Sequence, residues 1–122
     1  DETKKILDKK INVFATCVRV PVFVGHGESI SIETRKSISL DKAMEVLNEG
    51  KGIKVIDKRE NGGYATADET AGLDDVFISR LRLDKSVKNG LGLWVVSDNL
   101  RKGAALNSIQ IAEELIKEGL WK

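Results

Sequence analysis

The sequence predicts an α+β domain in which a mixed or antiparallel sheet packs against helices. Segments rich in β-branched residues or with alternating polarity follow the order strand, strand, helix, strand, strand, strand, helix. This order does not alternate strand with helix, as a doubly wound parallel sheet requires. Asn89-Gly90 between the last two predicted strands indicates a hairpin, which also favours antiparallel pairing.

The N-terminal quarter predicts one short helix and two strands. Residues 1–10 are charged and read as the end of a helix. Residues 11–25 are rich in valine and phenylalanine and predict a strand interrupted near Pro21, because proline cannot donate to a sheet ladder. Residues 29–34, "SISIET", alternate polar and apolar side chains and predict another strand.

The middle of the chain predicts a helix, a short strand and a loop. Ser39 can cap a helix that begins at Leu40, and Gly50 ends it. Residues 53–57, "IKVID", predict a strand. Residues 58–75 contain "NGG" and many acidic and small side chains, and we expect a loop there.

Two strands and a helix are predicted for the last third of the chain. The strands cover residues 76–84 and 91–99, and the helix covers about residues 100–118, ended by Gly119. Strict alternation along the first strand predicts two faces, one apolar and one partly basic. The basic face holds Val76, Ile78, Arg80 and Arg82, and the apolar face holds Phe77, Ser79, Leu81 and Leu83.

Composition excludes several classes of partner. The 122 residues carry a net charge of +1 with no long block of one sign, so nothing favours nucleic acid or an anionic membrane surface. No apolar run approaches the roughly 20 residues that cross a bilayer, and no signal peptide is recognisable. One cysteine cannot form an internal disulfide, which favours a reducing compartment such as the cytoplasm.

Arg19 and His26 are the first candidates for chemistry, at the two ends of the apolar run "RVPVFVGH". Histidine titrates near neutrality and can act as a general acid or base, and arginine binds carboxylates in a bidentate fork. The pair can share a pocket only if the chain bends between them, at Pro21 or Gly25. A turn histidine and a surface arginine explain the same residues.

The single cysteine, Cys17, is a second candidate. A nucleophilic thiol needs a helix N-terminus or a nearby cation, and Cys17 lies inside an apolar segment. We therefore expect a small buried side chain rather than a nucleophile. One histidine and one cysteine are too few ligands for a zinc site, so no metal is predicted.

The segment "SDNLRKGAALNSIQ", residues 97–110, is a third candidate because a helix begins just after a strand. Free N–H groups at such a helix start suit phosphate or amide groups. Ordinary capping by Ser97, Asp98 or Asn99 explains the segment equally well.

Taken together, three stretches resemble bacterial aspartate-semialdehyde dehydrogenase over nearly the whole chain. They are "ATCVRVPVFVGHGESISIET", "DDVFISRLRLD" and "GLGLWVVSDNLRKGAALNSIQIAEEL". The resemblance implies the C-terminal domain of a glyceraldehyde-3-phosphate-dehydrogenase-like fold, in part, and a homodimer. It also implies the reversible interconversion of L-aspartyl 4-phosphate with L-aspartate 4-semialdehyde and phosphate, through a thioacyl enzyme and with NADP. That reaction serves lysine, methionine, threonine and diaminopimelate biosynthesis.

The same resemblance implies roles for three residues. Arg19 matches the arginine that binds the substrate carboxylate, and His26 matches the acid–base histidine. Asn99 falls where the family has a polar side chain near the nicotinamide of NADP.

The family motifs that this sequence lacks define a further expectation. Neither the Asn-Cys-Ser/Thr motif of the nucleophilic cysteine nor the glycine-rich NADP-binding segment occurs in residues 1–122. We expect the chain to be part of the C-terminal catalytic and dimerisation domain, without the N-terminal NADP-binding domain and inactive by itself. One alternative is a stand-alone, non-catalytic dimerisation module of the same fold. Another is a related dehydrogenase acting on N-acetylglutamyl phosphate, against which "SDNLRKGAALNSIQ" argues.

Overall fold

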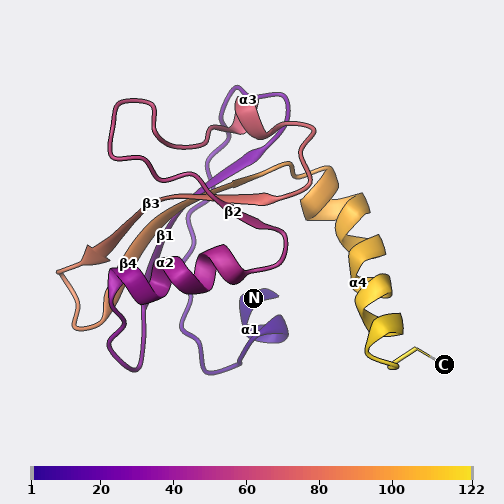
Figure 1. Ribbon diagram of the computed structural model, residues 1–122, viewed down its shortest axis with the longest axis horizontal. Helices are drawn as coiled ribbons and strands as arrows, with labels where there is room; N and C mark the ends of the chain where they lie inside the picture. Colours follow the sequence, from indigo (N-terminus) through magenta and orange to yellow (C-terminus); the bar gives the residue numbers. More distant parts are fainter. Residues whose placement is uncertain (1, 122) are drawn as a thin grey trace.

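A four-stranded sheet forms the centre of the molecule in the computed structural model, which describes residues 2–121 (Figure 1). The strand order is β1-β4-β3-β2. β4 pairs antiparallel with both β1 and β3, whereas β2 runs parallel to β3. The sheet is therefore mixed, and the predicted α+β class is confirmed. The strands are β1 (His26–Glu33), β2 (Ile53–Val55), β3 (Val76–Asp84) and β4 (Gly90–Ser97).

The helices lie on different sides of this sheet (Figure 1). α2 runs along one face, α3 sits at the opposite side of the molecule, and α4 projects away from the sheet toward the C-terminus. The described helices are α1 (Glu2–Ile6), α2 (Leu40–Glu49), α3 (Ala67–Thr70), the π-helical turn η1 (Arg101–Ala105) and α4 (Leu106–Lys117).

α2 begins and ends where the sequence predicts. The Ser39 hydroxyl accepts a hydrogen bond from the backbone N–H of Lys42 (3.2 Å), which satisfies one free donor of the first turn. Gly50 follows the last turn, and its N–H donates to the carbonyl of Leu47. The helix buries Ala43 against the sheet, so its apolar stripe covers the core.

The core lies between α2 and the central strands. Ala43 belongs there to one buried cluster with four other side chains, which are Ile78, Leu81, Leu91 and Leu93. Burying each leucine or isoleucine contributes about 1.5–3 kcal/mol relative to leaving it exposed. The core thus fixes which face of β3 and β4 points toward α2.

A β-bulge in β3 overturns the predicted alternation of that strand. The register shifts between Ser79 and Arg82, and Arg80 adopts a φ of 58°, in the left-handed region. Past the bulge the side-chain parity is reversed, so Leu81 joins Ile78 in the core. Strict alternation fails here because the extra residue moves every following side chain to the other face.

The carboxylate of Asp57 holds this bulge in place. Its side chain is only 2% exposed, and it accepts hydrogen bonds from the backbone N–H groups of Arg80 (2.9 Å) and Leu81 (3.1 Å). Arg59 forms an ion pair with the same carboxylate and donates to the carbonyl of Leu81. The segment after β2 therefore supplies the partners that the bulged ladder lacks.

The strand predicted for residues 11–25 is not formed. This segment is irregular, and it runs from α1 past the sheet to the start of β1 (Figure 1). Phe14 and Phe23 are almost fully exposed, at 95% and 107%. High β propensity does not make a strand without a neighbouring edge to pair with, and Pro21 removes one donor.

Several predicted boundaries also shift. β1 starts at His26 rather than at residue 29, and β2 ends at Val55. The predicted loop 58–75 contains the short helix α3, and the predicted helix 100–118 begins with the π-helical turn. The hairpin of β3 and β4 is confirmed.

Candidate functional site

His26 is the first residue of β1 and lies opposite Ser97, the last residue of β4. Its side chain is exposed, whereas the glycine before it is buried. The antiparallel pairing brings the end of β4 and the residues that follow it to the histidine. His26 and Asn99, 73 positions apart in the sequence, therefore lie at the same end of the sheet.

Gly25 joins these two candidates. Its N–H donates to Oδ1 of Asn99 (2.8 Å), and its φ of +99° is one that few other residues adopt. A Cβ at this position would lie 2.9 Å from the Cβ of Ala67 in α3, closer than carbon atoms approach. Glycine is therefore required here by both backbone conformation and space.

Gly27, on the other side of His26, lies beneath the indole of Trp94. A Cβ on Gly27 would fall 2.6 Å from Cζ2 of this ring. Trp94 also donates from Nε1 to the carbonyl of Ala65 (2.9 Å), which fixes the ring over the strand. Because they have no side chains, Gly25 allows α3 to pack closely on one side of His26, and Gly27 allows the indole of Trp94 to pack closely on the other.

Asp98, the residue after β4, anchors the start of the C-terminal helix. It is 3% exposed; its Oδ2 accepts from Gly72 N–H (2.8 Å), and its Oδ1 accepts from the N–H groups of Leu100 (2.7 Å) and Arg101 (3.0 Å). These bonds, chiefly the one from Gly72, hold the pKa of Asp98 below its ordinary value. Of the three residues considered from sequence, Asp98 is the one whose side chain accepts from N–H groups at the start of the helical segment.

The short helix α3 was missed from sequence, although it supports the histidine. It begins with a capping box in which the Thr66 hydroxyl accepts from Glu69 N–H and the Glu69 carboxylate accepts from Thr66 N–H. The spacing Thr-x-x-Glu is the recognised signal for such a box and was the available clue. Trp94, which also supports the site, carries no comparable sequence signal.

Arg19 and Cys17 lie in the irregular segment before β1, and both are exposed. The exposure of Cys17 corrects the prediction of a small buried side chain, which depended on the strand that is not formed. Among residues 2–121, no hydrogen bond or ion pair joins Arg19 to His26 or Asn99. The structure places His26 and Asn99 at the same end of the sheet.

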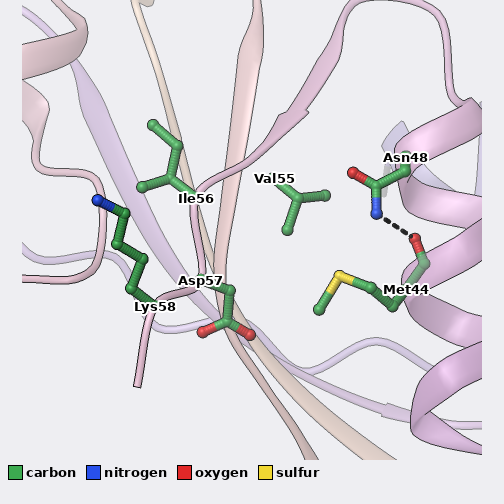
Figure 2. Close-up of a pocket in the computed structure, with 6 residues that line it drawn as sticks. All are labelled: Met44, Asn48, Val55, Ile56, Asp57 and Lys58. Atoms are coloured by element: carbon green, nitrogen blue, oxygen red, sulfur yellow. Dashed lines mark hydrogen bonds between the residues drawn. The ribbon is translucent and has the colours of Figure 1, made fainter. Parts of the chain in front are cut away.

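Two hollows lie elsewhere on the molecule. One, of about 340 Å³, is lined by Met44, Asn48, Val55, Ile56, Asp57 and Lys58 (Figure 2). The other, of about 410 Å³, lies between the turn after α2 and the C-terminal helix, where Lys51 pairs with Glu114 (2.6 Å). Neither is lined by Arg19, His26 or Asn99, and the carboxylate of Asp57 is already committed to the bulge. The candidate site is instead the open edge around His26.

Within residues 2–121 no cluster of three or more histidine, cysteine, aspartate or glutamate side chains is arranged to hold a metal ion. In that same part of the chain, every helix is too short or too polar to cross a membrane.

Comparison with known families gives this geometry a context. Residues 1–102 match the family described as semialdehyde dehydrogenase, dimerisation domain. The chain belongs to this family. The resemblance to aspartate-semialdehyde dehydrogenase is confirmed by curated relatives of that name. The chain is 54% identical over 120 residues to the protein from Aquifex aeolicus and 50% identical over 119 residues to that from Shewanella violacea.

Solved structures of semialdehyde dehydrogenases share the fold. The aspartate semialdehyde dehydrogenase II of Vibrio cholerae, solved in complex with ASA, matches with a TM-score of 0.86 and 45% identity over 95% of this chain. The enzyme from Francisella tularensis matches with a TM-score of 0.75 and 27% identity over 89% of the chain. The chain spans about a third of its relatives: 35% of the Aquifex and Shewanella proteins, 34% of the Vibrio structure and 33% of the Francisella structure.

Proposed function

We propose that this chain is part of the C-terminal catalytic and dimerisation domain of an NADP-dependent aspartate-semialdehyde dehydrogenase. The enzyme would interconvert L-aspartyl 4-phosphate with L-aspartate 4-semialdehyde and phosphate in amino-acid biosynthesis in the cytoplasm. The observation that carries this proposal is the 54% identity to the Aquifex enzyme across 98% of the chain. The nucleophilic cysteine and the nucleotide-binding domain would come from polypeptide outside residues 1–122.

His26 would act as the general acid and base. Its exposed imidazole stands at the end of the sheet, on a backbone held from both sides by Ala67 and Trp94. Such a fixed position allows a proton to move to and from a bound substrate without a search for the right geometry. Arg19 would bind the substrate carboxylate through its guanidinium fork.

The residues around Asn99 fit a nicotinamide cofactor in one respect. Its Oδ1 accepts from Gly25 N–H, so its Nδ2 group is the part left to face a ligand. An amide N–H₂ group suits the carboxamide oxygen of a nicotinamide. When bound, NADP would supply the hydride chemistry, and this chain would orient it.

The exposed apolar surface supports a homodimer and further contacts within the full-length enzyme. Phe14, Phe23 and Trp121 are all at least 66% exposed, along with many aliphatic side chains of residues 6–22 and α4. Exposed apolar area of this extent marks surfaces that other polypeptide covers. The small-molecule substrate and phosphate complete the expected partners, and nothing in the charge pattern favours nucleic acid.

The test uses the full-length enzyme and two substitutions in this chain. We expect His26→Ala to lower kcat by about 10²–10⁴-fold, the range of a lost general acid–base group, with little change in Tm. We expect Arg19→Lys to raise KM for the semialdehyde with a smaller effect on kcat, because an ammonium cannot copy the bidentate fork. Phosphate-dependent reduction of NADP measures both.

Arg35→Lys is the matched control, because this exposed arginine follows the opposite end of β1 from His26 and pairs only weakly with Asp8 (3.8 Å). It should leave kcat and KM unchanged. Normal turnover in the His26→Ala enzyme would contradict the assigned role. Absence of the reaction in the wild-type enzyme would contradict the proposed function itself.

A stand-alone dimerisation module is the second candidate, favoured by the exposed apolar side chains of the segment before β1 and of α4. The coding sequence upstream decides between the two. A glycine-rich nucleotide-binding motif and an Asn-Cys-Ser/Thr motif support the enzyme, and their absence supports the module.

A further inference from the structure

We propose that Asn99 is a positioning residue for His26, acting through the backbone N–H of Gly25; this inference rests on the proposed function. The carbonyl oxygen of the Asn99 side chain fixes the residue immediately before the histidine. Asn99 thereby sets the direction in which His26 enters β1. The role is additional to any contact that its Nδ2 group makes with a nicotinamide.

The first step of the argument is the position of Gly25. The ladder between β1 and β4 begins with His26 opposite Ser97, so the N–H of Gly25 lies just outside it. Gly25 is buried, and a buried N–H without a partner costs about 1–3 kcal/mol. Asn99 Oδ1, at 2.8 Å, is the acceptor that the fold supplies.

The second step is the polarity of the bond. A backbone N–H can only donate, so the atom of the Asn99 amide that faces Gly25 must be its oxygen. The orientation of the amide is therefore settled by chemistry, and its N–H₂ group points elsewhere. Aspartate retains an acceptor for Gly25 but has no donor, whereas alanine has neither.

The third step is the rigidity of the Asn99 backbone. The preceding residue, Asp98, is buried and accepts from Gly72 N–H and from two N–H groups of the following turn. Gly72 follows α3, and α3 packs against Gly25 through Ala67. Asn99 and Gly25 are thus connected twice, directly by their hydrogen bond and indirectly through Asp98, Gly72 and α3.

The experiment compares Asn99→Ala with Asn99→Asp in the full-length enzyme. Amide exchange of Gly25 is followed by NMR, with ¹⁵N-glycine and ¹³C-carbonyl valine labels that select Val–Gly pairs such as Val24–Gly25. We expect faster exchange at Gly25 in Asn99→Ala and protection close to wild type in Asn99→Asp. We also expect kcat to fall about 10²-fold in Asn99→Ala, since a small misplacement of a reacting group has that effect. The fall should be smaller in Asn99→Asp, which keeps the acceptor for Gly25 and loses only the Nδ2 donor.

Asn89→Ala is the matched control at the other end of β1. The Nδ2 group of Asn89 donates to the carbonyl of Thr34 (3.0 Å). The substitution therefore also removes a hydrogen bond between an asparagine side chain and the backbone beside this strand. Gly25 exchange and kcat should not change in this variant.

Two results would overturn the proposal. One is unchanged Gly25 exchange in Asn99→Ala, and the other is an equal loss of kcat in Asn99→Asp and Asn99→Ala. A rise in KM for NADP in both variants without a fall in kcat would likewise assign Asn99 to cofactor contact alone. If the wild-type enzyme lacks the semialdehyde reaction, the proposed function fails, while the exchange measurement still decides whether Asn99 anchors Gly25.

Discussion

At the scale of single residues, the position of His26 depends on groups that are not its own side chain. Gly25 donates a hydrogen bond to Asn99 and packs closely against Ala67, and Gly27 packs directly against the indole of Trp94. Each glycine is required because a methyl group would meet an atom that cannot move freely. The flanking glycines could be noticed in the sequence, but their neighbours are 42 to 74 positions away.

Gly27→Ala tests this close packing. The added Cβ would overlap the Trp94 ring, so the indole must shift and its bond to the Ala65 carbonyl must weaken. We expect a loss of about 1–3 kcal/mol in the free energy of unfolding, typical of overpacking, measured by chemical denaturation. Gly103→Ala is the control, because its Cβ would make only an ordinary contact of 3.6 Å, and its stability should be equal or higher. Unchanged stability in Gly27→Ala would disprove the close packing.

At the scale of elements, two irregular features hold the sheet and the last helix in place, and both depend on a buried aspartate. Asp57 supplies acceptors to the bulge in β3, and Asp98 supplies acceptors to the turn that leads into α4. A periodic pattern in the sequence predicts regular helices and strands, but it does not reveal the extra residue of a β-bulge. The extent of the strand 76–84 was predicted correctly. The prediction of which side chains beyond Ser79 point toward the core was wrong.

Asp57→Ala should destabilise the bulge. It would leave two backbone N–H groups and the guanidinium of Arg59 without their shared acceptor. We expect a loss of about 1–3 kcal/mol in the free energy of unfolding of the full-length enzyme, the usual result when hydrogen bonds lose one partner. Arg80→Gly, by contrast, relieves the φ of 58° and should be neutral or slightly stabilising. The assignment of Asp57 fails if the Asp57→Ala enzyme unfolds at the wild-type denaturant concentration.

Asp98→Asn should change the acid dependence of stability. The folded pKa of Asp98 lies below its ordinary value of 3.8, chiefly because Gly72 N–H donates to the carboxylate. The ionised form therefore stabilises the fold at pH values above 3.8, and this contribution disappears as pH falls through the folded pKa. We expect the Tm gap between wild type and Asp98→Asn to be constant near neutral pH and to narrow below about pH 4. A Tm gap that does not change with pH would refute the assignment.

At the scale of the whole molecule, the described chain combines a well-packed sheet with an extensive uncovered apolar surface. α2 covers one face of the sheet (Figure 1) and forms the core with it. The segment before β1 and much of α4, by contrast, expose apolar side chains. Under the proposed function, other parts of the full-length enzyme and its second subunit cover this surface.

The isolated chain should therefore self-associate. We expect the mass measured by analytical ultracentrifugation to exceed the monomer mass of 13.4 kDa, because association removes the exposed phenylalanines from water. We also expect the chain to bind an apolar fluorescent dye, which reports exposed apolar surface. The double substitution Phe14→Ser with Phe23→Ser should reduce both signals. Val46→Ser, which removes a half-exposed valine from α2, serves as the control. A monodisperse monomer that does not bind the dye would contradict the idea that other polypeptide covers this apolar surface.

The sequence by itself determined the fold class, the extent of α2, the hairpin of β3 and β4, and the membership of the family, because these depend on local pattern and on residue identity. Only the tertiary structure decided the bulge at Arg80, the irregular course of residues 11–25 and the bond from Gly25 to Asn99. Each of these is set by which distant segments meet. A strand needs an edge to pair with, a bulge needs an acceptor, and a buried N–H needs a partner, and none of these requirements is visible along a single stretch of chain.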